Sequence, residues 1–483
     1  MNSQIRKLYI VVFLMVLSLA LAATYIQFFA APRLNADARN SRTILHAAER
    51  DRGPIIVDGV AVAESVKIED SRRYERKYPG GELYAPVTGW FSSTLGSSTG
   101  LESSADEILE GDAPSLWTQR IENLLTGQER RGGGIDLTLS ADMQETAAAA
   151  LGGREGAVVA IEAKTGAVKA FYSSPSYDPN QLAATDSGPA LEYYKSLEED
   201  PTKPLYNRTI AGDRYPPGSA FKIVTAAALL ESGNYDPDTH IDGPATYTLP
   251  DTETELPNIT GMPCGDGNPT LTEAFARSCN TSFAIGGVEV GADALREKAQ
   301  DFGFGEKLNI PMYVTPSLFP EELNRPQTGL VAIGQGDLQV TPMQMAMVGA
   351  AIANDGTIMK PYLIDSVLNS DLEVQKTTKP EVFKEALTPQ VASQLRSMMV
   401  SVVETRYGTG GSMYIDGQNV AAKTGTAELG DRNIAWSIAF IANDNPIVVA
   451  VAVEGDELNP NPGGGSDAGP IVRAVLEASG GVQ

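Results

Sequence analysis

Ser219 and Lys222 are a pair of residues whose types and spacing could do nucleophilic chemistry without histidine. Two prolines and a glycine (216–218) precede the serine, and the mostly apolar segment AFKIVTAAALLES (220–232) follows it. This pattern predicts a buried helix that begins near Ser219. Free N–H groups and the helix dipole in its first turn would stabilise negative charge that develops there.

Lys222 lies three residues after Ser219, so a helix places both side chains on one face, one turn apart. Burial lowers the pKa of an amine whose charge is not paired, and a neutral amine beside a serine hydroxyl can act as its base. The ordinary alternative is that Ser219 caps the helix while Lys222 extends its amine to water. The Ser-x-x-Lys pattern alone leaves both interpretations open.

Two later segments favour the catalytic interpretation. Ser278-Cys279-Asn280 ends a predicted helix (LTEAFARS), and Lys423-Thr424-Gly425-Thr426 follows a polar loop (GTGGSMYIDGQN). Taken singly, the first is an ordinary polar helix end and the second an ordinary strand end beside a turn. In the order Ser-x-x-Lys, Ser-x-Asn, Lys-Thr-Gly, however, these patterns form the motif set of the serine enzymes that interact with penicillin.

A second Lys-Thr-Gly tripeptide tests this interpretation. Lys164-Thr165-Gly166 precedes Ser219 and lies between the segments AVVAI (157–161) and AVKAFY (167–172), which predict a β-hairpin. Lys164 is therefore predicted to be a turn residue. We expect the active-site copy to lie on an internal strand that borders the cleft, where the small Gly425 lets a substrate approach closely.

Composition excludes several other kinds of site. The chain has 37 Lys and Arg against 61 Asp and Glu, a formal net charge of −24, which disfavours a nucleic-acid partner. It has only two histidines, so neither a zinc site nor a histidine-based serine triad is expected. We predict no metal and no organic cofactor.

The N-terminus predicts a single membrane span. Residues 8–31 begin with the uncharged run LYIVVFLMVLSLALAA and continue with a moderately apolar stretch, and Arg6 and Lys7 precede them. Positive charge before the span places residues 1–7 in the cytoplasm and everything after Pro32 outside. The alternative is a cleaved signal peptide, since alanines at 22–23 and 30–31 are small enough for a cleavage site.

Cys264 and Cys279 are the only two cysteines and enclose a short loop. In an exported protein they are expected to pair, and two buried free thiols are the alternative.

The distribution of polar and apolar segments along the chain predicts two extracytoplasmic parts. Residues 32–133 are polar and short-segmented, and they end in the glycine-rich stretch TGQERRGGG (126–134), which is typical of a linker. Residues 134–483 carry strands near both ends, with helices between them and a closing helix at 468–478. This arrangement predicts an α+β domain in which one antiparallel sheet is packed by helices.

Over nearly its whole length the chain resembles the class B penicillin-binding proteins, which are membrane-anchored D,D-transpeptidases that cross-link peptidoglycan. Within that family it is most similar to the actinobacterial penicillin-binding protein A group. Besides the three motifs, the matching stretches are Arg39-Asn40-Ser41-Arg42, Arg52-Gly53, Tyr84-Ala85-Pro86-Val87-Thr88-Gly89, Pro175-Ser176-Tyr177-Asp178-Pro179-Asn180, Gly334-Gln335-Gly336 and Thr341-Pro342-Met343-Gln344. The resemblance implies a penicillin-binding, β-lactamase-like transpeptidase domain on an extended, non-catalytic pedestal. It also implies one activity, because residues 32–133 leave no room for a glycan-polymerising domain.

The resemblance implies a role for each acyl-transfer residue. Ser219 would attack the penultimate D-Ala carbonyl of a stem peptide, and Lys222 would take the serine proton. Backbone N–H groups of Ser219 and Thr426 would form the oxyanion hole, and Ser278 would relay a proton to the leaving amine.

The same resemblance assigns the substrate contacts. Asn280 would hold the donor peptide backbone, and Lys423 would supply positive potential. Thr424 and Thr426 would bind the terminal carboxylate, with Gly425 between them. The implied partners are a D-Ala-D-Ala donor, an amine acceptor, β-lactams, the membrane, and other proteins of cell-wall synthesis or division, with a role in division and cell shape.

Two other functions stay open at this point. The first is a D,D-carboxypeptidase or β-lactamase, which would pass the acyl group to water, although a diffusible hydrolase needs neither span nor pedestal. The second is a non-enzymatic β-lactam receptor or division scaffold, which the intact motif set disfavours. One departure from the family is Ala220, where many relatives have threonine; it is expected to face away from the nucleophile.

Overall fold

The structure is a computed structural model of the 483-residue chain, and it describes residues 2–26, 48–116, 131–212 and 214–480. Three predicted features fall partly or wholly outside these ranges. They are the end of the membrane span (27–31), the stretch Arg39-Asn40-Ser41-Arg42 and the first part of the linker (126–130).

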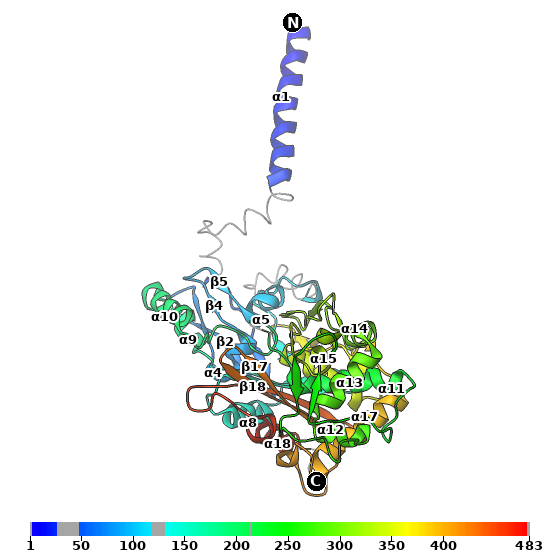
Figure 1. The fold of residues 1–483 in the computed structure, drawn as a ribbon. Helices are drawn as coiled ribbons and strands as arrows, with labels where there is room; N and C mark the ends of the chain where they lie inside the picture. Colours follow the sequence, from blue (N-terminus) through cyan, green and yellow to red (C-terminus); the bar gives the residue numbers. More distant parts are fainter. Residues whose placement is uncertain (1, 27–47, 117–130, 213, 481–483) are drawn as a thin grey trace.

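Helix α1 (Asn2–Thr24) begins the described chain (Figure 1). Its segment Gln4–Thr24 is long and apolar enough to cross a membrane, and none of it is buried against the rest of the protein. The helix starts before the apolar run and includes the basic pair at 6–7.

The C-terminal part, residues 134–480, is built on a five-stranded sheet with the order β17-β18-β19-β7-β8, in which every neighbouring pair is antiparallel. The strands are β7 (Gly156–Glu162), β8 (Val168–Ser174), β17 (Val420–Leu429), β18 (Arg432–Ile441) and β19 (Ile447–Glu454). Two strands therefore come from the start of this part and three from its end. The predicted α+β arrangement is confirmed.

Helices cover both faces of this sheet. On one face α8 (Ala141–Leu151) and α18 (Gly469–Ala478) pack side by side over the strands (Figure 1). On the other face α16 (Pro342–Ala353) is buried along its whole length between the sheet and the outer helices. Those outer helices are α11 (Lys222–Glu231), α12 (Leu271–Ala276), α13 (Asn280–Val290) and α17 (Pro389–Glu404).

Shorter elements complete the C-terminal part. They are α9 (Pro179–Ala183), α10 (Ser187–Glu199), α14 (Ala292–Asp301), α15 (Arg325–Ala332), β9 (Thr246–Thr248), β10 (Glu255–Pro257), β11 (Leu308–Asn309), β12 (Tyr313–Val314), β13 (Thr357–Met359) and β16 (Val382–Glu385).

A second sheet, of six strands in the order β15-β14-β6-β1-β2-β3, crosses the predicted boundary between the two parts. Its strands are β1 (Ile55–Val57), β2 (Val60–Lys67), β3 (Tyr74–Lys77), β6 (Ile135–Leu137), β14 (Ile364–Leu368) and β15 (Val374–Thr377). Three strands precede residue 133 and three follow it. The N-terminal part also contains α4 (Gly81–Thr88), β4 (Phe91–Ser92), β5 (Ser97–Ser98), α5 (Gly100–Ser104) and α6 (Asp106–Leu109).

The glycine run at 132–134 is packed, so the linker prediction is wrong for these residues. Gly132 N–H donates to Asp51 O (2.7 Å), and Gly133 N–H donates to Ile108 O (3.0 Å). A Cβ on Gly132 would lie 1.9 Å from Leu109 O, which no side chain could tolerate. The glycines are there because two backbones approach closely, not because the segment is loose.

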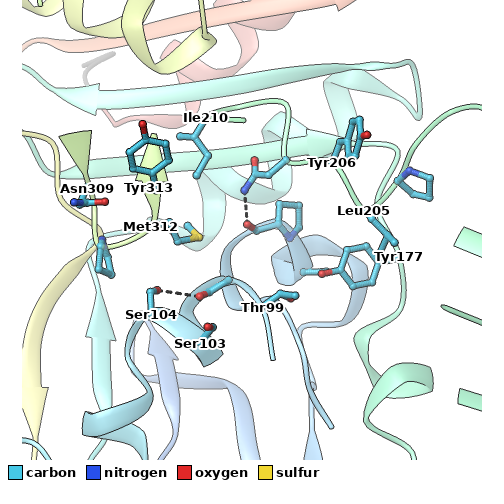
Figure 2. A pocket seen from close by; sticks show the side chains of 17 residues that line it. Thr99, Ser103, Ser104, Tyr177, Leu205, Tyr206, Ile210, Asn309, Met312 and Tyr313 are labelled. Atoms are coloured by element: carbon cyan, nitrogen blue, oxygen red, sulfur yellow. Dashed lines mark hydrogen bonds between the residues drawn. The ribbon is translucent and has the colours of Figure 1, made fainter. Parts of the chain in front are cut away.

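Side chains of the C-terminal part also form hydrogen bonds with the backbone of the N-terminal part, residues 48–116. Asn180 accepts from Tyr78 N–H (2.9 Å) and donates to Tyr78 O (3.1 Å), and Asn207 Nδ2 donates to Pro86 O (2.6 Å). Beside the last contact lies a cavity of about 380 Å³, with Tyr206 and Tyr313 on opposite sides of it (Figure 2). These contacts hold the two parts together without involving the motif residues.

Candidate active site

Ser219 sits in a tight turn that the preceding sequence forces. After Pro216 and Pro217 the chain makes a 3-10 turn (Gly218–Phe221), and the α-helix α11 begins only at Lys222. Gly218 has φ +52°, and a Cβ there would lie 2.3 Å from Thr426 O on strand β17. The expected helix thus starts as a 3-10 turn because it must bring Ser219 against a neighbouring strand.

Lys222 is fully buried at the start of α11. Its Nζ donates to Ser278 O (2.7 Å) and to Asn280 Oδ1 (2.7 Å), and it lies 3.4 Å from Ser278 Oγ. The alternative in which Lys222 extends its amine to water is therefore wrong. The Ser-x-x-Lys and Ser-x-Asn motifs meet through this amine.

Burial lowers the pKa of Lys222 well below its usual value, and the nearby Lys423 lowers it further. None of the groups that Lys222 contacts is a carboxylate. A neutral amine can donate two hydrogen bonds and keeps one lone pair, which matches its two close acceptors and leaves the lone pair for a proton. The site therefore favours Lys222 as a base.

Ser278 and Asn280 lie where two helices meet, between α12 and α13. Ser278 adopts φ +60°, a left-handed conformation that a non-glycine residue rarely takes and that is often found at functional sites. Cys279 is the N-cap of α13 and is joined to Cys264 by a disulfide with a Cα–Cα distance of 5.9 Å. Both half-cystines are buried, so the bridge ties the loop after residue 264 to the turn that carries Ser278 and Asn280.

Lys423 approaches Ser278 from strand β17. Its Nζ donates to Ser278 Oγ (2.9 Å) and to Thr424 O (2.9 Å), and burial lowers its pKa from 10.5 to about 7. The prediction that this strand borders the site fits these contacts, but the prediction that it is internal is wrong. Strand β17 is the outermost strand of its sheet, and an open edge can pair with an extended peptide.

The three residues after Lys423 have different surroundings. Thr424 Oγ1 lies 2.6 Å from Thr409 Oγ1, and Thr426 Oγ1 accepts from Gly464 N–H (3.4 Å). A Cβ on Gly425 would lie 2.8 Å from Ala220 N. Gly425 is thus small because the turn that carries Ser219 packs against it, and the expected close approach of a substrate stays a prediction.

Comparison with known proteins agrees with this geometry. Residues 156–477 match the penicillin binding protein transpeptidase domain, and residues 52–135 match the penicillin binding protein A dimerisation domain. The chain is 42% identical over 496 residues to peptidoglycan D,D-transpeptidase PbpA of Mycolicibacterium smegmatis, covering 99% of both chains. It is 40% identical to the PbpA of Mycobacterium tuberculosis, again over 99% of each.

The chain belongs to the penicillin-binding protein transpeptidase family.

Solved structures match this penicillin-binding protein along most of its length. Penicillin-binding protein A from M. tuberculosis, as a ceftriaxone acyl-enzyme complex, superposes with a TM-score of 0.84 at 39% identity and covers 90% of this chain and 99% of its own. The penicillin G acyl-enzyme complex of the same protein gives 0.83 at 39% identity, with 89% and 99% covered. The predicted fold and family are confirmed.

The second Lys-Thr-Gly lies elsewhere in this penicillin-binding protein. Lys164 is exposed in the turn between β7 and β8, as the hairpin pattern predicted. Gly166 packs there against the backbone of Lys360, where a Cβ would lie 2.4 Å from the carbonyl oxygen. This tripeptide makes a turn and contacts none of the motif residues within the described part of the chain.

One expected contact is absent, and two contacting residues were not predicted. Within the ranges that the structure describes, Ser219 Oγ makes no hydrogen bond, and the Lys222 amine donates to Ser278 O and Asn280 Oδ1 instead. Thr409 and Gly464, which hold the threonines of β17, were missed. Both lie in glycine-rich loops (GTGG and GGG), and such loops near a motif are the only sequence signal that could have indicated them.

Proposed function

We propose that this penicillin-binding protein cross-links peptidoglycan stem peptides as a serine D,D-transpeptidase, through an acyl-enzyme at Ser219. One observation carries the assignment of roles. The amines of Lys222 and Lys423, from two different motifs, both lie within 3.4 Å of the hydroxyl of Ser278, from the third. Three segments far apart in sequence therefore form one hydrogen-bonded group beside the Ser219 turn.

In the acylation step, Ser219 Oγ attacks the carbonyl of the penultimate D-Ala, and Lys222 accepts its proton. The free-enzyme contacts of Lys222 do not exclude this step, because catalytic hydrogen bonds often form only when substrate is bound. Backbone N–H groups of Ser219 and Thr426 stabilise the tetrahedral oxyanion, where one such donor is typically worth about 3–4 kcal/mol.

In the departure of the terminal D-Ala, Ser278 passes a proton to the leaving amine. Its hydroxyl lies between the two lysine amines, at 3.4 Å from Lys222 and 2.9 Å from Lys423. A hydroxyl can accept one proton while donating another, so it can connect Lys222 to the leaving group.

The remaining motif residues hold the donor peptide. Asn280 orients its backbone amides, and Lys423 attracts its terminal carboxylate together with Thr424 and Thr426. Gly425 completes the strand edge along which the peptide lies. The amine of a second stem peptide then attacks the acyl-enzyme, and a β-lactam mimics the donor and stalls at the acyl stage.

The arrangement of the whole chain follows from the same proposal. A single span over residues 8–31, which α1 begins, anchors the protein in the cell membrane, with residues 1–7 cytoplasmic. Residues 32–133 form a pedestal, and residues 134–483 form an extracytoplasmic transpeptidase domain. The positive charges before the span and the disulfide between Cys264 and Cys279 support export. Pedestal and helix also offer surfaces to other proteins of wall synthesis or division.

The test uses the full chain in detergent or nanodiscs with a lipid-linked stem-peptide polymer. We expect cross-linked product, covalent labelling by fluorescent penicillin, and loss of both in Ser219→Ala. Release of D-Ala without cross-links would instead indicate a carboxypeptidase. Labelling that persists in Ser219→Ala would place the nucleophile elsewhere.

A further inference from the structure

The segment before Ser219 is held by side chains outside the three motifs. Tyr215 is buried, and its backbone pairs with Val340 in both directions, at 2.9 and 2.8 Å. Its hydroxyl donates to Glu454 Oε1 at 2.6 Å, at the end of strand β19. Tyr215, four positions before Ser219, is thus bound to the C-terminal end of β19 in the five-stranded sheet.

Glu454 is itself fixed by a buried arginine. Arg208 Nε donates to the same Glu454 Oε1 (2.9 Å), while its Nη2 donates to Glu155 Oε2 (3.0 Å) and to Thr202 O (2.7 Å). Arg208 is only 6% exposed. A charge-assisted, buried contact of this kind holds a carboxylate in one position.

The hydroxyl end of Tyr215 is not packed against protein atoms on every side. A cavity of about 570 Å³ borders Tyr215, Arg208 and Glu454. On the side of this space the tyrosine ring lacks packing contacts, so the hydrogen bond to Glu454 contributes to holding its hydroxyl end. Loss of the bond to Glu454 would therefore let the Tyr215 side chain move.

A second contact acts on the next residue. Trp436 Nε1 donates to Pro216 O (3.0 Å), and the indole packs edge-on against the Tyr215 ring, with 6.2 Å between the ring centres. Trp436 lies on β18 directly opposite Gly425 of β17. It therefore connects the segment before the nucleophile to the strand that carries Lys-Thr-Gly.

The turn at Gly218, between these contacts and Ser219, is tightly packed on both sides. Gly218 N–H donates to Gly334 O (3.0 Å), and a Cβ on Gly334 would lie 1.9 Å from Gly218 O. On the other side the same turn packs against the backbone of Thr426. A displacement at residues 215–216 must therefore pass to Ser219 or to strand β17.

We propose that Glu454 and Trp436 are positioning residues for acyl transfer. Through Tyr215 and Pro216 they set the separation between the backbone N–H groups of Ser219 and Thr426. This inference rests on the proposed function, in which those two groups form the oxyanion hole. Because the donors act only on the charge that develops during attack, their misplacement slows the chemical step and leaves substrate binding unchanged.

The test is Tyr215→Phe, which deletes one hydroxyl and keeps the ring against Trp436. Rapid-mixing kinetics with a fluorescent penicillin separate the non-covalent dissociation constant from the acylation rate constant. We expect the rate constant to fall about tenfold, because small displacements of reacting groups have effects of this order, and the dissociation constant to stay within about twofold. Trp436→Phe is expected to act in the same direction.

Two controls separate positioning from general stability. Tyr235→Phe deletes another tyrosine–carboxylate hydrogen bond, to Glu289, away from the nucleophile segment. It should acylate at the wild-type rate. Glu454→Gln keeps an oxygen acceptor and should recover most of the rate that Glu454→Ala loses.

The outcomes are distinguishable from failure of the proposed function. Labelled Ser219→Ala would refute the nucleophile itself. If Ser219→Ala is unlabelled but Tyr215→Phe acylates at the wild-type rate, only the positioning inference is overturned. It is also overturned if Tyr235→Phe slows acylation as much as Tyr215→Phe, or if every loss of rate follows a fall in melting temperature.

Discussion

The substitution Lys222→Met separates catalysis from stability at one position. Methionine fills nearly the same buried volume as lysine but removes the amine that donates to Ser278 O and Asn280 Oδ1. Leaving two buried acceptors unpaired costs about 1–3 kcal/mol each. Removing an amine that burial forces toward neutrality, with no carboxylate beside it, offsets part of that cost. We therefore expect a folded variant with stability lowered by a few kcal/mol at most.

The effect on rate should be much larger than the effect on folding. Loss of a general base typically lowers a rate by about 10²–10⁴-fold, which corresponds to about 3–5 kcal/mol in the activation barrier. The other lysine of the motif set, Lys423, is held by Ser278 and by Thr424 O rather than by Ser219. The second-order rate constant of acylation should therefore fall by two to four orders of magnitude.

The assay is a time course of fluorescent-penicillin labelling, checked by intact-protein mass, beside a thermal melt of each variant. Lys164→Met is the matched control, because Lys164 belongs to the other Lys-Thr-Gly and is exposed in a hairpin turn. It should acylate like the wild type. If Lys222→Met acylates within tenfold of the wild type, or if Lys164→Met loses more activity, the assignment of the base is refuted.

Four further outcomes follow from the site. Reducing the disulfide between Cys264 and Cys279 should cost about 3 kcal/mol for a loop of this length, and hydrogen exchange should rise first beside Ser278; superimposable melting curves would contradict this. The folded-state pKa of Lys423 is lowered, so stability should rise with pH between about 7 and 10.5, and less so in Lys423→Met. Non-covalent affinity for a carboxylate-bearing penicillin should also weaken above about pH 7, as Lys423 loses its charge; a flat titration curve would oppose this. Gly425→Ala should slow acylation, because its Cβ would lie 2.8 Å from Ala220 N, and wild-type kinetics would show that the turn can shift freely.

The site residues were predictable because their information is local. Ser219 and Lys222 need only the i, i+3 spacing of one helix, and the hairpin around Lys164 needs only two alternating strands and a turn. The buried environment of Lys222 followed from the apolar residues of its own helix. The burial of a motif residue was therefore within reach of sequence reasoning, whereas the contacts of the Lys222 amine with Ser278 and Asn280, in place of Ser219, were not.

The arrangement of strands was not predictable in the same way. Periodicity shows that a segment is a strand but not which strand lies beside it, so β17 could not be recognised as the outermost strand. Likewise β14, at 364–368, pairs with β6 at 135–137 across more than two hundred residues. No local signal marks such a pairing. The sequence therefore predicted a sharp boundary near residue 133, whereas the six-stranded sheet contains strands from both sides of it.

Glycine was the residue most easily misinterpreted. Its lack of a side chain gives flexibility in a free segment, but it also permits backbones to touch, and composition does not distinguish the two uses. The run at 132–134 is of the second kind. The neighbours that require glycine there come from distant parts of the chain.

The two lysines of the site make opposite demands on protonation. As a base, Lys222 must be neutral, whereas Lys423 attracts a carboxylate only when it is charged. Their nitrogens lie 3.4 and 2.9 Å from the same Ser278 oxygen, and both are buried, so a charge on one disfavours a charge on the other. Lys423 keeps a pKa of about 7 while that of Lys222 is lowered both by burial and by Lys423. Both amines are thus disfavoured as charged groups, and the further contribution of Lys423 favours a neutral Lys222, as the proposed acylation step requires of its base.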